Sequence, residues 1–414
     1  MLPRAEKKCW KILFWEINVE KNTEYKYMLL KRENAALILH DGTVFPGKKL
    51  GFLEDSGRIG EVVFNTSMSG YQEIISDPSY KGQMVCFTYP SIGNYGINLD
   101  DNESEKPFLD GIIVRDYCDI PSNFRSIKTL EEYLFEHKLA GITEVDTRAL
   151  VRHIREKGSM PGGIFIGDFN DSSDLYKTAL AKVRSAPSME GANLTKEFNG
   201  KEANHFVNEY IALHKINTND FHKVAVLDFG IKHSILKHLL DVNILPVVYP
   251  GDLPMKEWID FTIDNFNGFF LSNGPGDPAS VTNGIENIRK LLNYKKPIFG
   301  ICLGHQMLSI ALGAKTYKLK FGHHGGNQPV KWNDKKRVMI TAQNHGFSVD
   351  LEFFNSDSFN KAGGVCELNL NDNTVEGFYL EKDKILSIQY HPEAGPGPND
   401  ALYIFKKFKK MLGK

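Results

Sequence analysis

One cysteine, set between two glycines where a strand gives way to a helix, constrains the fold of this chain more than any other feature. The apolar run at 296–301 is typical of a buried parallel strand, and the apolar residues over 303–311 recur at helical spacing. Cys302 lies between them, with Gly300 and Gly304 two residues away on either side, in the G-x-nucleophile-x-G pattern of a nucleophile elbow. We expect a tight turn there, because glycines have no Cβ to clash with the crossing backbone. The helix N-terminus behind the sulfur favours the thiolate.

A second apolar strand, 385–390, leads into His391-Pro392-Glu393. Residues two apart at a strand end point to the same side, so His391 and Glu393 are candidates for a base and the acid that orients it. A lone cysteine in an apolar context is more often a small buried side chain, and a lone histidine after a strand is more often a surface residue. The strand–turn–helix context of Cys302 and the paired acid favour the catalytic interpretation.

The composition limits the kinds of protein that this chain could be. Its 414 residues predict two or three domains, and its formal net charge of −1 gives no indication of nucleic-acid binding. The five cysteines are scattered and form no C-x-x-C pair, which argues against a disulfide framework or a zinc site and fits a reducing compartment. No apolar run approaches the length of a membrane span, and the charged N-terminus is a poor signal peptide. We expect a soluble, cytoplasmic protein with no metal site and no membrane contact.

Changes in composition divide the chain into four segments. Residues 1–34 form an N-terminal extension in which aromatic and charged residues are mixed. Residues 35–170 hold mostly strands with two or three helices and predict an α+β domain without a catalytic constellation. Residues 171–222 are polar and predict a connecting segment with one helix, near 173–185. Residues 223–414 form the last domain.

The last domain alternates strands with helices, beginning with a strand at 224–230 and including a helix near 254–263. This α/β repetition predicts a mainly parallel sheet with helices on both faces and the nucleophile elbow within it. Ligands of such sheets bind beyond the carboxyl ends of the strands. Gly274, Cys302 and His391 all fall at those ends.

Two short motifs suggest functions that their surroundings do not support. Asp228-Phe229-Gly230 matches a kinase tripeptide, but the catalytic-loop and glycine-rich motifs of kinases are missing. His323-His324 would point to opposite faces of a strand, with no carboxylate or cysteine at ligand spacing. We therefore expect hydrogen-bonding roles for this pair.

Longer strings resemble a known family. The elbow at 300–306, the string at 391–393 and the strand end at 270–278 are similar to the triad (class I) glutamine amidotransferases. A closer resemblance is to one branch of them, the small (glutaminase) subunits of carbamoyl phosphate synthetases. That resemblance covers about residues 36–414. It is carried by the strings at 65–74, 77–80, 321–327 and 343–347.

The resemblance implies an activity and a partner. Glutamine would be hydrolysed to glutamate and ammonia, and the ammonia would pass to a large synthetase subunit that makes carbamoyl phosphate from bicarbonate and ATP. This chain would need no cofactor, and ATP and Mg²⁺ would bind to the large subunit. The sequence agrees in containing no G-x-x-x-x-G-K-[ST] phosphate loop.

The residues and the resemblance together suggest roles within the site. Cys302 would attack the amide carbon, His391 would act as base and then acid, and Glu393 would orient His391. The main-chain N–H groups of Leu303 and Gly276 are the expected oxyanion donors, since Pro275 has none. By resemblance, the substrate would be held by Ser79, Gly274, Gly276, Gln306, Asn344, Gly346 and Phe347.

Two other functions fit parts of the sequence. A stand-alone cysteine hydrolase of γ-glutamyl compounds would use the same elbow, but it would not need the first domain. A non-catalytic regulatory partner would be favoured if Cys302, His391 or Glu393 were missing, and all three are present.

Overall fold

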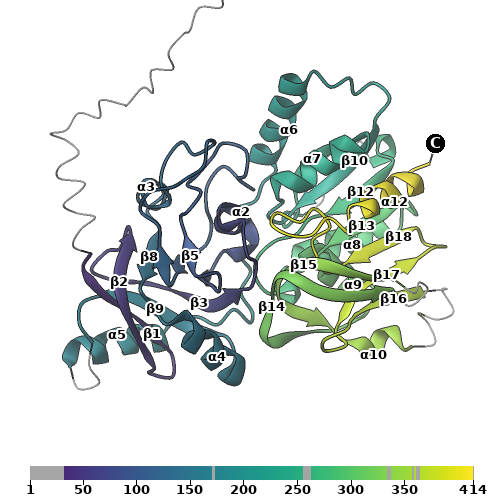
Figure 1. Ribbon diagram of the computed structural model, residues 1–414. Helices are drawn as coiled ribbons and strands as arrows, with labels where there is room; N and C mark the ends of the chain where they lie inside the picture. The colour runs from purple at the N-terminus through teal and green to yellow at the C-terminus, as the bar shows by residue number, and fades with distance from the viewer. Residues whose placement is uncertain are drawn as a thin grey trace, which may run out of the picture.

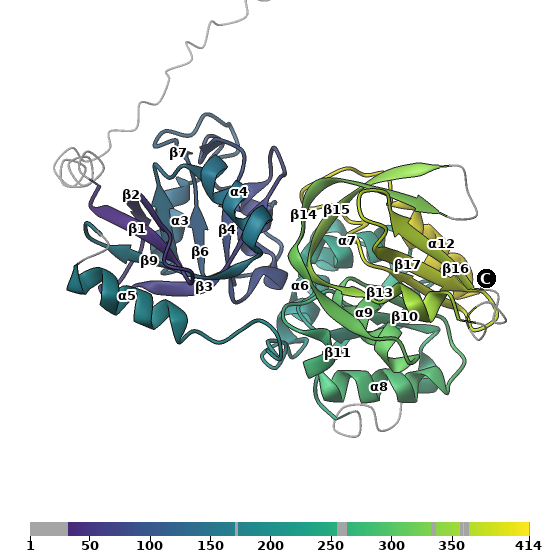
Figure 2. The ribbon, with the colours of Figure 1, turned by 90° about the horizontal axis from the view of Figure 1, so that it is seen from below.

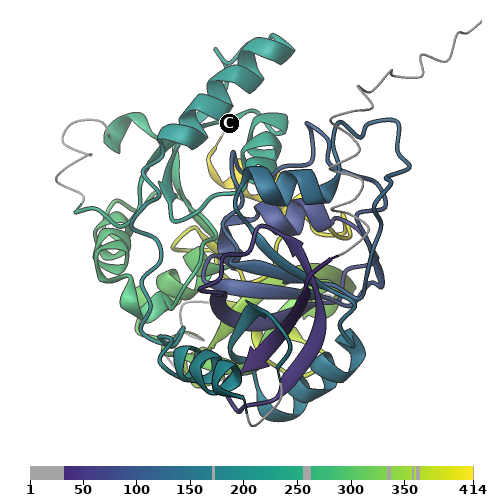
Figure 3. The same ribbon diagram turned by 90° about the vertical axis from the view of Figure 1, so that its left-hand side faces the viewer.

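The structure, a computed structural model, describes residues 32–169, 173–254, 263–332, 337–356, 359 and 364–413. The predicted N-terminal extension lies almost entirely outside these residues. A barrel domain and a sheet domain lie side by side, and the connecting chain crosses from one to the other (Figures 1 and 2). In Figure 3 the barrel lies in front of the sheet domain.

The first domain is built around a closed barrel with the strand order β1-β2-β8-β6-β4-β3-β9. Its strands are β1 (Asn34–Leu39), β2 (Val44–Gly51), β3 (Arg58–Asn65), β4 (Gln83–Phe87), β6 (Gly111–Ile113), β8 (Ala140–Thr143) and β9 (Met160–Ile166). The short strands β5 (Ser91–Ile92) and β7 (Asp116–Tyr117) pair outside the barrel. Its helical elements are α2 (Tyr71–Ser76), η1 (Pro78–Tyr80), α3 (Leu130–Glu136) and α4 (Thr147–Lys157). This arrangement confirms the predicted α+β class, and the closure into a barrel was not predicted.

Local sequence signals account for several boundaries in this domain. β1 and β2 are joined by a turn in which the Leu39 amide donates to the Thr43 carbonyl, and Gly42 supplies the positive φ of 95° that the turn requires. A capping box, with Thr129 as N-cap and Glu132 three residues later, starts α3. Asp146 accepts a hydrogen bond from the Ala149 amide and starts α4.

The connecting segment contains two helices, although the sequence analysis expected one. The helix α5 (Asp174–Arg184) packs on the barrel and confirms the helix expected near 173–185. The second, α6 (Lys201–His214), was missed. Ala203, Phe206, Val207, Tyr210 and Ile211 recur at helical spacing within it, and Ala203 and Val207 are buried, so a helical signal was present in this otherwise polar segment.

The second domain holds a nine-stranded sheet among the described residues, with the strand order β11-β10-β12-β13-β18-β17-β16-β14-β15. The strands of its parallel part are β10 (His222–Asp228), β11 (Ile244–Pro250), β12 (Gly268–Leu271), β13 (Ile298–Ile301) and β18 (Ile385–Ile388). Beyond β18 the pairing is antiparallel, through β17 (Val375–Leu380), β16 (Gly364–Asn369), β14 (Thr316–Trp332) and β15 (Val338–Val349). The α/β class is confirmed, and the long antiparallel extension is a feature that the strand–helix alternation did not indicate.

Helices cover both faces of the parallel part (Figure 1). They are α7 (His233–Asp241), α8 (Thr282–Leu292), α9 (Leu303–Ala311) and α12 (Tyr403–Met411), with the short elements η3 (Ile263–Asn265), η4 (Pro278–Ser280) and α10 (Leu351–Phe354) at the edges. Alternate residues of β10 serve the two faces: Val224 and Val226 pack with α6, α7 and α12, whereas Ala225 and Leu227 pack with α8 and α9. The helix expected near 254–263 falls largely outside the described residues.

Polar contacts join the two domains. The Thr66 amide donates to the His324 carbonyl, and the Thr66 hydroxyl is 3.0 Å from Asn327 Oδ1. Farther along the boundary, Glu103 of the first domain accepts from the amide and hydroxyl of Ser234 at the start of α7. These contacts fix the barrel against the carboxyl-end edge of the sheet. Within the described residues, no helix is both long and apolar enough to cross a membrane.

Candidate active site

Cys302 lies at the predicted elbow, between the end of β13 and the start of α9. Its backbone is strained, with φ 52° and ψ −105°, in a region that residues with a Cβ rarely adopt. Both flanking glycines are required by close packing: a Cβ on Gly300 would lie 2.9 Å from the Gly304 carbonyl oxygen, and a Cβ on Gly304 would lie 2.3 Å from that of Leu271. The thiol is 2% exposed, and its sulfur is 3.5 Å from the Asn344 carbonyl oxygen.

His391 and Glu393 follow β18, the strand next to β13, and are both 3% exposed. His391 Nδ1 is 2.6 Å from Glu393 Oε1, so the carboxylate fixes the ring and its tautomer. Burial by itself would lower the pKa of His391, but the charge of Glu393 and the neighbouring Cys302 sulfur outweigh it and raise that pKa. The imidazolium is therefore favoured beside the sulfur, as a thiolate–imidazolium pair requires.

Lys232 is a third charged neighbour, and the sequence analysis missed it. Its ammonium group, 1% exposed, lies 3.1 Å from Glu393 Oε1 and 3.6 Å from Glu103 Oε1 of the barrel domain. It also donates to the carbonyls of Ala394 and Gly395. Burial would raise the pKa of Glu393, but the charges of Lys232 and His391 lower it well below its ordinary value. Lys232 thus keeps the orienting acid ionised inside the protein.

A cavity opens beside Cys302. All seven residues predicted to hold the substrate line it, whereas Leu303, predicted as an oxyanion donor, does not. The lining residues are Ser79, Gln83, Met189, Gly274, Gly276, Cys302, Gln306, Asn344, His345, Gly346 and Phe347. Residues from five separate stretches of sequence are therefore gathered around the thiol.

The barrel domain supplies one wall of this cavity. Ser79, in η1, accepts a hydrogen bond from Asn273 Nδ2 at 2.8 Å. Asp77 of the same segment accepts one from Asn344 Nδ2 at 3.1 Å, and His324 Nδ1 lies 2.9 Å from Asn344 Oδ1. Both amide ends of Asn344 are thus fixed by the protein, so this residue offers the cavity a rigid surface.

Gln306, on the first turn of α9, is oriented by two acceptors. Its Nε2 atom donates to the Phe347 carbonyl at 2.7 Å and to Gln389 Oε1 at 2.9 Å. Both donor hydrogens of the amide are used within the protein, which leaves Oε1 as the group that Gln306 presents to a ligand. An acceptor at this position suits a donor such as an ammonium group.

The main-chain N–H groups of Leu303 and Gly276 are the predicted oxyanion donors, and both residues lie near Cys302. Leu303 is the first residue of α9, where the amide has no acceptor within the helix and shares the positive end of the helix dipole. Gly276 has φ 93°, lines the cavity with Cys302 and follows Pro275, which has no N–H. The arrangement is suited to stabilising negative charge next to the sulfur.

Comparisons with known proteins found family matches in both domains. A family model described as the carbamoyl-phosphate synthase small chain, CPSase domain, matches residues 37–164, and one described as glutamine amidotransferase class-I matches residues 225–411. The carbamoyl phosphate synthase small chain of Syntrophotalea carbinolica is 48% identical over 386 residues, covering 92% of this chain and 98% of that protein. The chain belongs to the carbamoyl phosphate synthase small chain family.

Other small chains of the family are nearly as similar. That of a Nostoc species is 46% identical and covers 91% of this chain and 95% of its own length. That of Aquifex aeolicus is also 46% identical, with 92% of this chain and 99% of its own covered. The match extends over nearly the whole of these proteins, so this small chain has both domains of its family and carries a glutamine amidotransferase domain.

Residues that the sequence analysis missed in this small chain lie beside motifs that it considered. Lys232 follows β10 just after Asp228-Phe229-Gly230, at the same carboxyl-end edge as Cys302. Its position just after a strand end was the available signal, and the sequence analysis did not use it. Glu103 gives no such signal, because it lies in a loop of the other domain and approaches Lys232 only through the domain contact.

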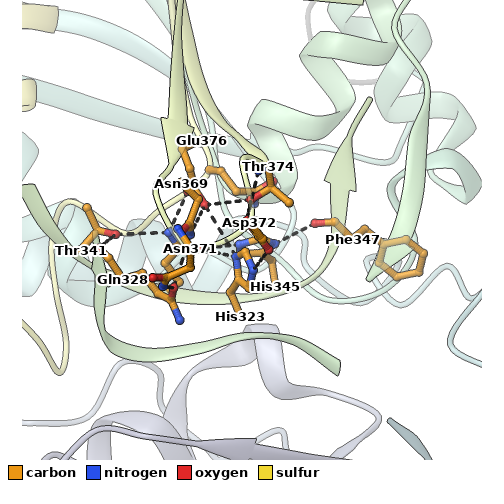
Figure 4. Close-up of polar contacts among 12 residues, drawn as sticks. His323, Gln328, Thr341, His345, Phe347, Asn369, Asn371, Asp372, Thr374 and Glu376 are labelled. Atoms are coloured by element: carbon orange, nitrogen blue, oxygen red, sulfur yellow. Dashed lines mark hydrogen bonds and ion pairs between the residues drawn. The ribbon is translucent and has the colours of Figure 1, made fainter. Parts of the chain in front are cut away.

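His323 and His324 point to opposite sides of β14, as predicted. His324 faces Asn344 and the barrel residue Tyr80, whereas His323 is hydrogen-bonded to Asp372 and Gln343 on the other side. The sequence has no carboxylate at ligand spacing from this pair, but the fold brings one close: ligand-type atoms of His323, His345 and Glu376 lie within 4.8 Å of one another (Figure 4). Each of these side chains is already hydrogen-bonded to protein groups, so the three belong to a hydrogen-bonded network.

Proposed function

We propose that this chain hydrolyses L-glutamine to glutamate and ammonia through a Cys302–His391–Glu393 triad, and that the ammonia serves a large, ATP-dependent synthetase subunit. The observation that carries the proposal is the positive-φ cysteine at the elbow, with the buried His391–Glu393 pair on the neighbouring strand. The expected coupling to a synthetase is supported by the small-chain family, whose name indicates part of a larger assembly.

The first half of the reaction forms a thioester. The Cys302 sulfur attacks the side-chain amide carbon of glutamine, and the carbonyl oxygen becomes an oxyanion facing the N–H groups of Leu303 and Gly276. His391 gives its proton to the amide nitrogen, the C–N bond breaks, and ammonia leaves. Glu393 compensates the charge of His391 while it is protonated.

The second half regenerates the thiol. His391, now neutral, takes a proton from a water molecule, whose oxygen attacks the thioester carbon. The same N–H groups face the second oxyanion. The C–S bond then breaks, glutamate is released, and the sulfur and His391 return to their starting pair. Substrate selection follows from neutral hydrogen-bonding groups at Ser79, Gln306 and Asn344, which suit the ammonium and carboxylate of an amino acid.

A second, smaller cavity beside His391 supports a separate path for ammonia. His391 and Asn344 line it, and it continues between the domains past Asp77, Lys232 and Tyr80. Because His391, the acid that would protonate the leaving group, lines this cavity and Cys302 does not, ammonia formed at Cys302 has a space to enter other than the substrate pocket. A stand-alone hydrolase would have no use for such a space.

The test of this function is the substitution Cys302→Ser in the complex of this chain with its large subunit. Sulfur is replaced by oxygen with little change in volume, and the hydroxyl is a poor nucleophile in a site arranged for a thiolate. Glutamine-dependent carbamoyl phosphate synthesis should fall by orders of magnitude. Ammonia-dependent synthesis should stay near the wild-type rate, with gel filtration confirming that the subunits remain together. A parallel loss of ammonia-dependent synthesis in an intact complex would show that this chain takes part in the synthetic step.

A further inference from the structure

The chain that connects the two domains also reaches the active site. It passes from the barrel to the sheet domain between α5 and α6 (Figure 2), and it lies outside both family matches, which cover residues 37–164 and 225–411. No step of the proposed mechanism uses it. One of its residues, Met189, nevertheless lines the substrate cavity together with Cys302. We define residues 189–195 as the crossing segment.

The crossing segment is bonded to the loop that carries an expected oxyanion donor. Asn193 forms an isolated antiparallel bridge with Gly276. The Asp277 amide donates to the Ala192 carbonyl at 2.9 Å, and the Gly191 amide donates to Asp277 Oδ2 at 2.8 Å. These two bonds run in opposite directions between the same two stretches of chain. They therefore fix the orientation of the peptide that follows Gly276.

Gly276 and the crossing segment are also in close steric contact. A Cβ on Gly276 would lie 2.5 Å from the Ala192 carbonyl oxygen and 3.2 Å from the Leu194 nitrogen. The backbone of the segment thus lies directly against the Cα atom of Gly276. A displacement of the segment would change the position of this residue, whose N–H group the proposed mechanism requires at the oxyanion.

The side chain of Asn193 anchors the crossing segment to the sheet domain. Its Nδ2 atom donates to Asp252 Oδ2 at 2.8 Å and to the Ser280 carbonyl at 3.4 Å. Its Oδ1 atom accepts from the amide and the hydroxyl of Thr195, which is completely buried. One side chain therefore ties the sheet domain to the part of the segment that pairs with Gly276.

Met189 brings an apolar side chain to a cavity lined mainly by polar residues and glycines. Met189 and Phe347 are the lining residues with large apolar side chains. The methyl carbon of Met189 lies 3.1 Å from the place that a Cβ on Gly82 would occupy, so the side chain ends against the barrel backbone. The Ala192 amide donates to the Met189 carbonyl at 3.2 Å and closes a turn that fixes this residue. The methylene groups of a glutamine side chain are stabilised by apolar contacts of this kind.

From these contacts we propose that the crossing segment is a third part of the active site, with two separate roles. Met189 is a specificity-determining residue that contacts the methylene groups of the substrate. Asn193 is a positioning residue that acts on Gly276 through the backbone of the segment. The proposal rests on the proposed function for the identity of the substrate. The two roles differ in their kinetics, because a contact that is equal in the ground state and the transition state affects KM, whereas an oxyanion donor affects kcat.

Met189→Ala tests the first role. It removes the apolar end of the side chain, and we expect KM for glutamine to rise roughly tenfold, the scale of one methylene group in an apolar pocket, with kcat little changed. Met189→Leu is the matched control, because it keeps an apolar side chain of similar volume, and its KM should stay within about threefold of wild type. A wild-type KM in the alanine variant would overturn the role of Met189.

Asn193→Ala tests the second role. The loop then loses its anchor but keeps its donor, so we expect kcat to fall roughly tenfold, less than the 10²- to 10³-fold cost of removing an oxyanion donor, with KM little changed. Lys196→Ala, at an exposed position just beyond the segment, is the matched control and should leave both constants unchanged.

The contrast between the two variants is the decisive result. Equal changes of kcat and KM in Met189→Ala and Asn193→Ala would overturn the proposal, because a general structural defect gives that pattern. If Asn193→Ala does not fold, Thr195→Val replaces it: this change removes one of the two donors to Asn193 Oδ1 and should lower kcat roughly threefold. A wild-type kcat in the folded variant at either position would overturn the role of Asn193.

A second measurement does not depend on glutamine. The Asp277 amide is bonded to the Ala192 carbonyl, so its hydrogen exchange should be roughly tenfold faster in Asn193→Ala than in the wild type and unchanged in Met189→Ala. Equal exchange in the three proteins would overturn the role of Asn193 even if kcat fell. If the wild type did not hydrolyse glutamine, the proposed function would fail and the role of Met189 with it. The exchange rates would then decide the role of Asn193 alone.

Discussion

Replacing the orienting acid by its amide, Glu393→Gln, separates the charge of this residue from its shape. Glu393 is buried, its Oε1 atom binds both His391 and Lys232, and its Oε2 atom has no hydrogen-bond partner among the described residues. The amide oxygen can still accept the Nδ1–H bond of His391. The NH₂ group would then occupy the Oε2 position, where no acceptor awaits it, and Lys232 would face His391 without the intervening negative charge.

The size of the effect follows from the lost charge. Two unit charges about 4 Å apart interact by about 4 kcal/mol at an effective dielectric constant near 20, and each 1.36 kcal/mol corresponds to a factor of ten in rate. Part of this is retained, because the amide dipole still binds the ring. We therefore expect kcat/KM for glutamine hydrolysis to fall by roughly 10²- to 10³-fold. The loss should be smaller than for Cys302→Ala or His391→Ala, since the orienting member of a triad contributes least.

The assay is steady-state glutaminase activity of the purified chain with its large subunit, measured for all three triad variants under one set of conditions. Glu103→Gln is the matched control: it removes a negative charge 3.6 Å from Lys232 but leaves the Glu393–His391 bond in place. We expect its loss to stay within about tenfold, the scale of one modest hydrogen bond or ion pair. Equal losses for the three triad variants, or a loss below tenfold for Glu393→Gln, would refute the reasoning.

Three further outcomes are expected. An electrophilic glutamine analogue should alkylate Cys302 first at neutral pH. Burial raises the thiol pKa of Cys86 and of Cys366, the latter to about 12, so these two cysteines should react slowly. Mass mapping that found Cys86 and Cys366 labelled as fast as Cys302 would contradict this. Gly304→Ala should abolish glutaminase activity and lower Tm, since its Cβ would lie 2.3 Å from the Leu271 carbonyl oxygen, whereas Gly346→Ala, with open space around its Cβ, should leave Tm unchanged. Burial lowers the pKa of His323, but Asp372 and Glu376 outweigh burial and raise that pKa from 6.5 to about 9. The stability that protonated His323 contributes is therefore complete below pH 6.5 and is lost as pH rises through about 9. The free energy of unfolding of the wild type should therefore lose roughly 3 kcal/mol more than that of His323→Gln between pH 6 and pH 9.5, and parallel curves would show that His323 is not the group responsible.

The sequence predicted the arrangement of Cys302, His391 and Glu393 better than it predicted the fold around them. The elbow was predictable because Gly300, Cys302 and Gly304 obey a local steric rule, and His391 and Glu393 because their spacing along one strand end sets their directions. The barrel closure depends on pairing between distant segments, such as β1 with β9 and β2 with β8, which periodicity does not encode. The antiparallel strands β14–β17 pair mostly with their neighbours in sequence, but the strand–helix alternation that precedes them gave no indication of them. Helix α6 was missed although its apolar residues recur at helical spacing and pack on the core, because the segment around it is polar.

Within the site, what could not be predicted depends on contacts between domains. Lys232 and Glu103 are ordinary charged residues in the sequence and acquire their roles only when the barrel meets the sheet. Glu376 is similar, because β17 lies beside β18 and β16, so its carboxylate enters a cluster of histidines from β14 and β15. Ser79 was named from family resemblance, and its place in the cavity depends on the bond from Asn273 across the domain boundary.

The hydrogen bonds of Asp77 and Ser79 to the other domain mean that both domains form the pocket. An isolated amidotransferase domain, cut out at 223, would retain the thiol and its base but lose one side of the pocket and the acceptor for Asn344. The barrel therefore forms part of the pocket wall, although Cys302 belongs to the other domain. A small movement of the barrel relative to the sheet domain would alter the hydrogen bonds at the pocket and leave the elbow unchanged. Under the proposed function, a large subunit bound to the barrel would therefore be able to change the rate of glutamine hydrolysis.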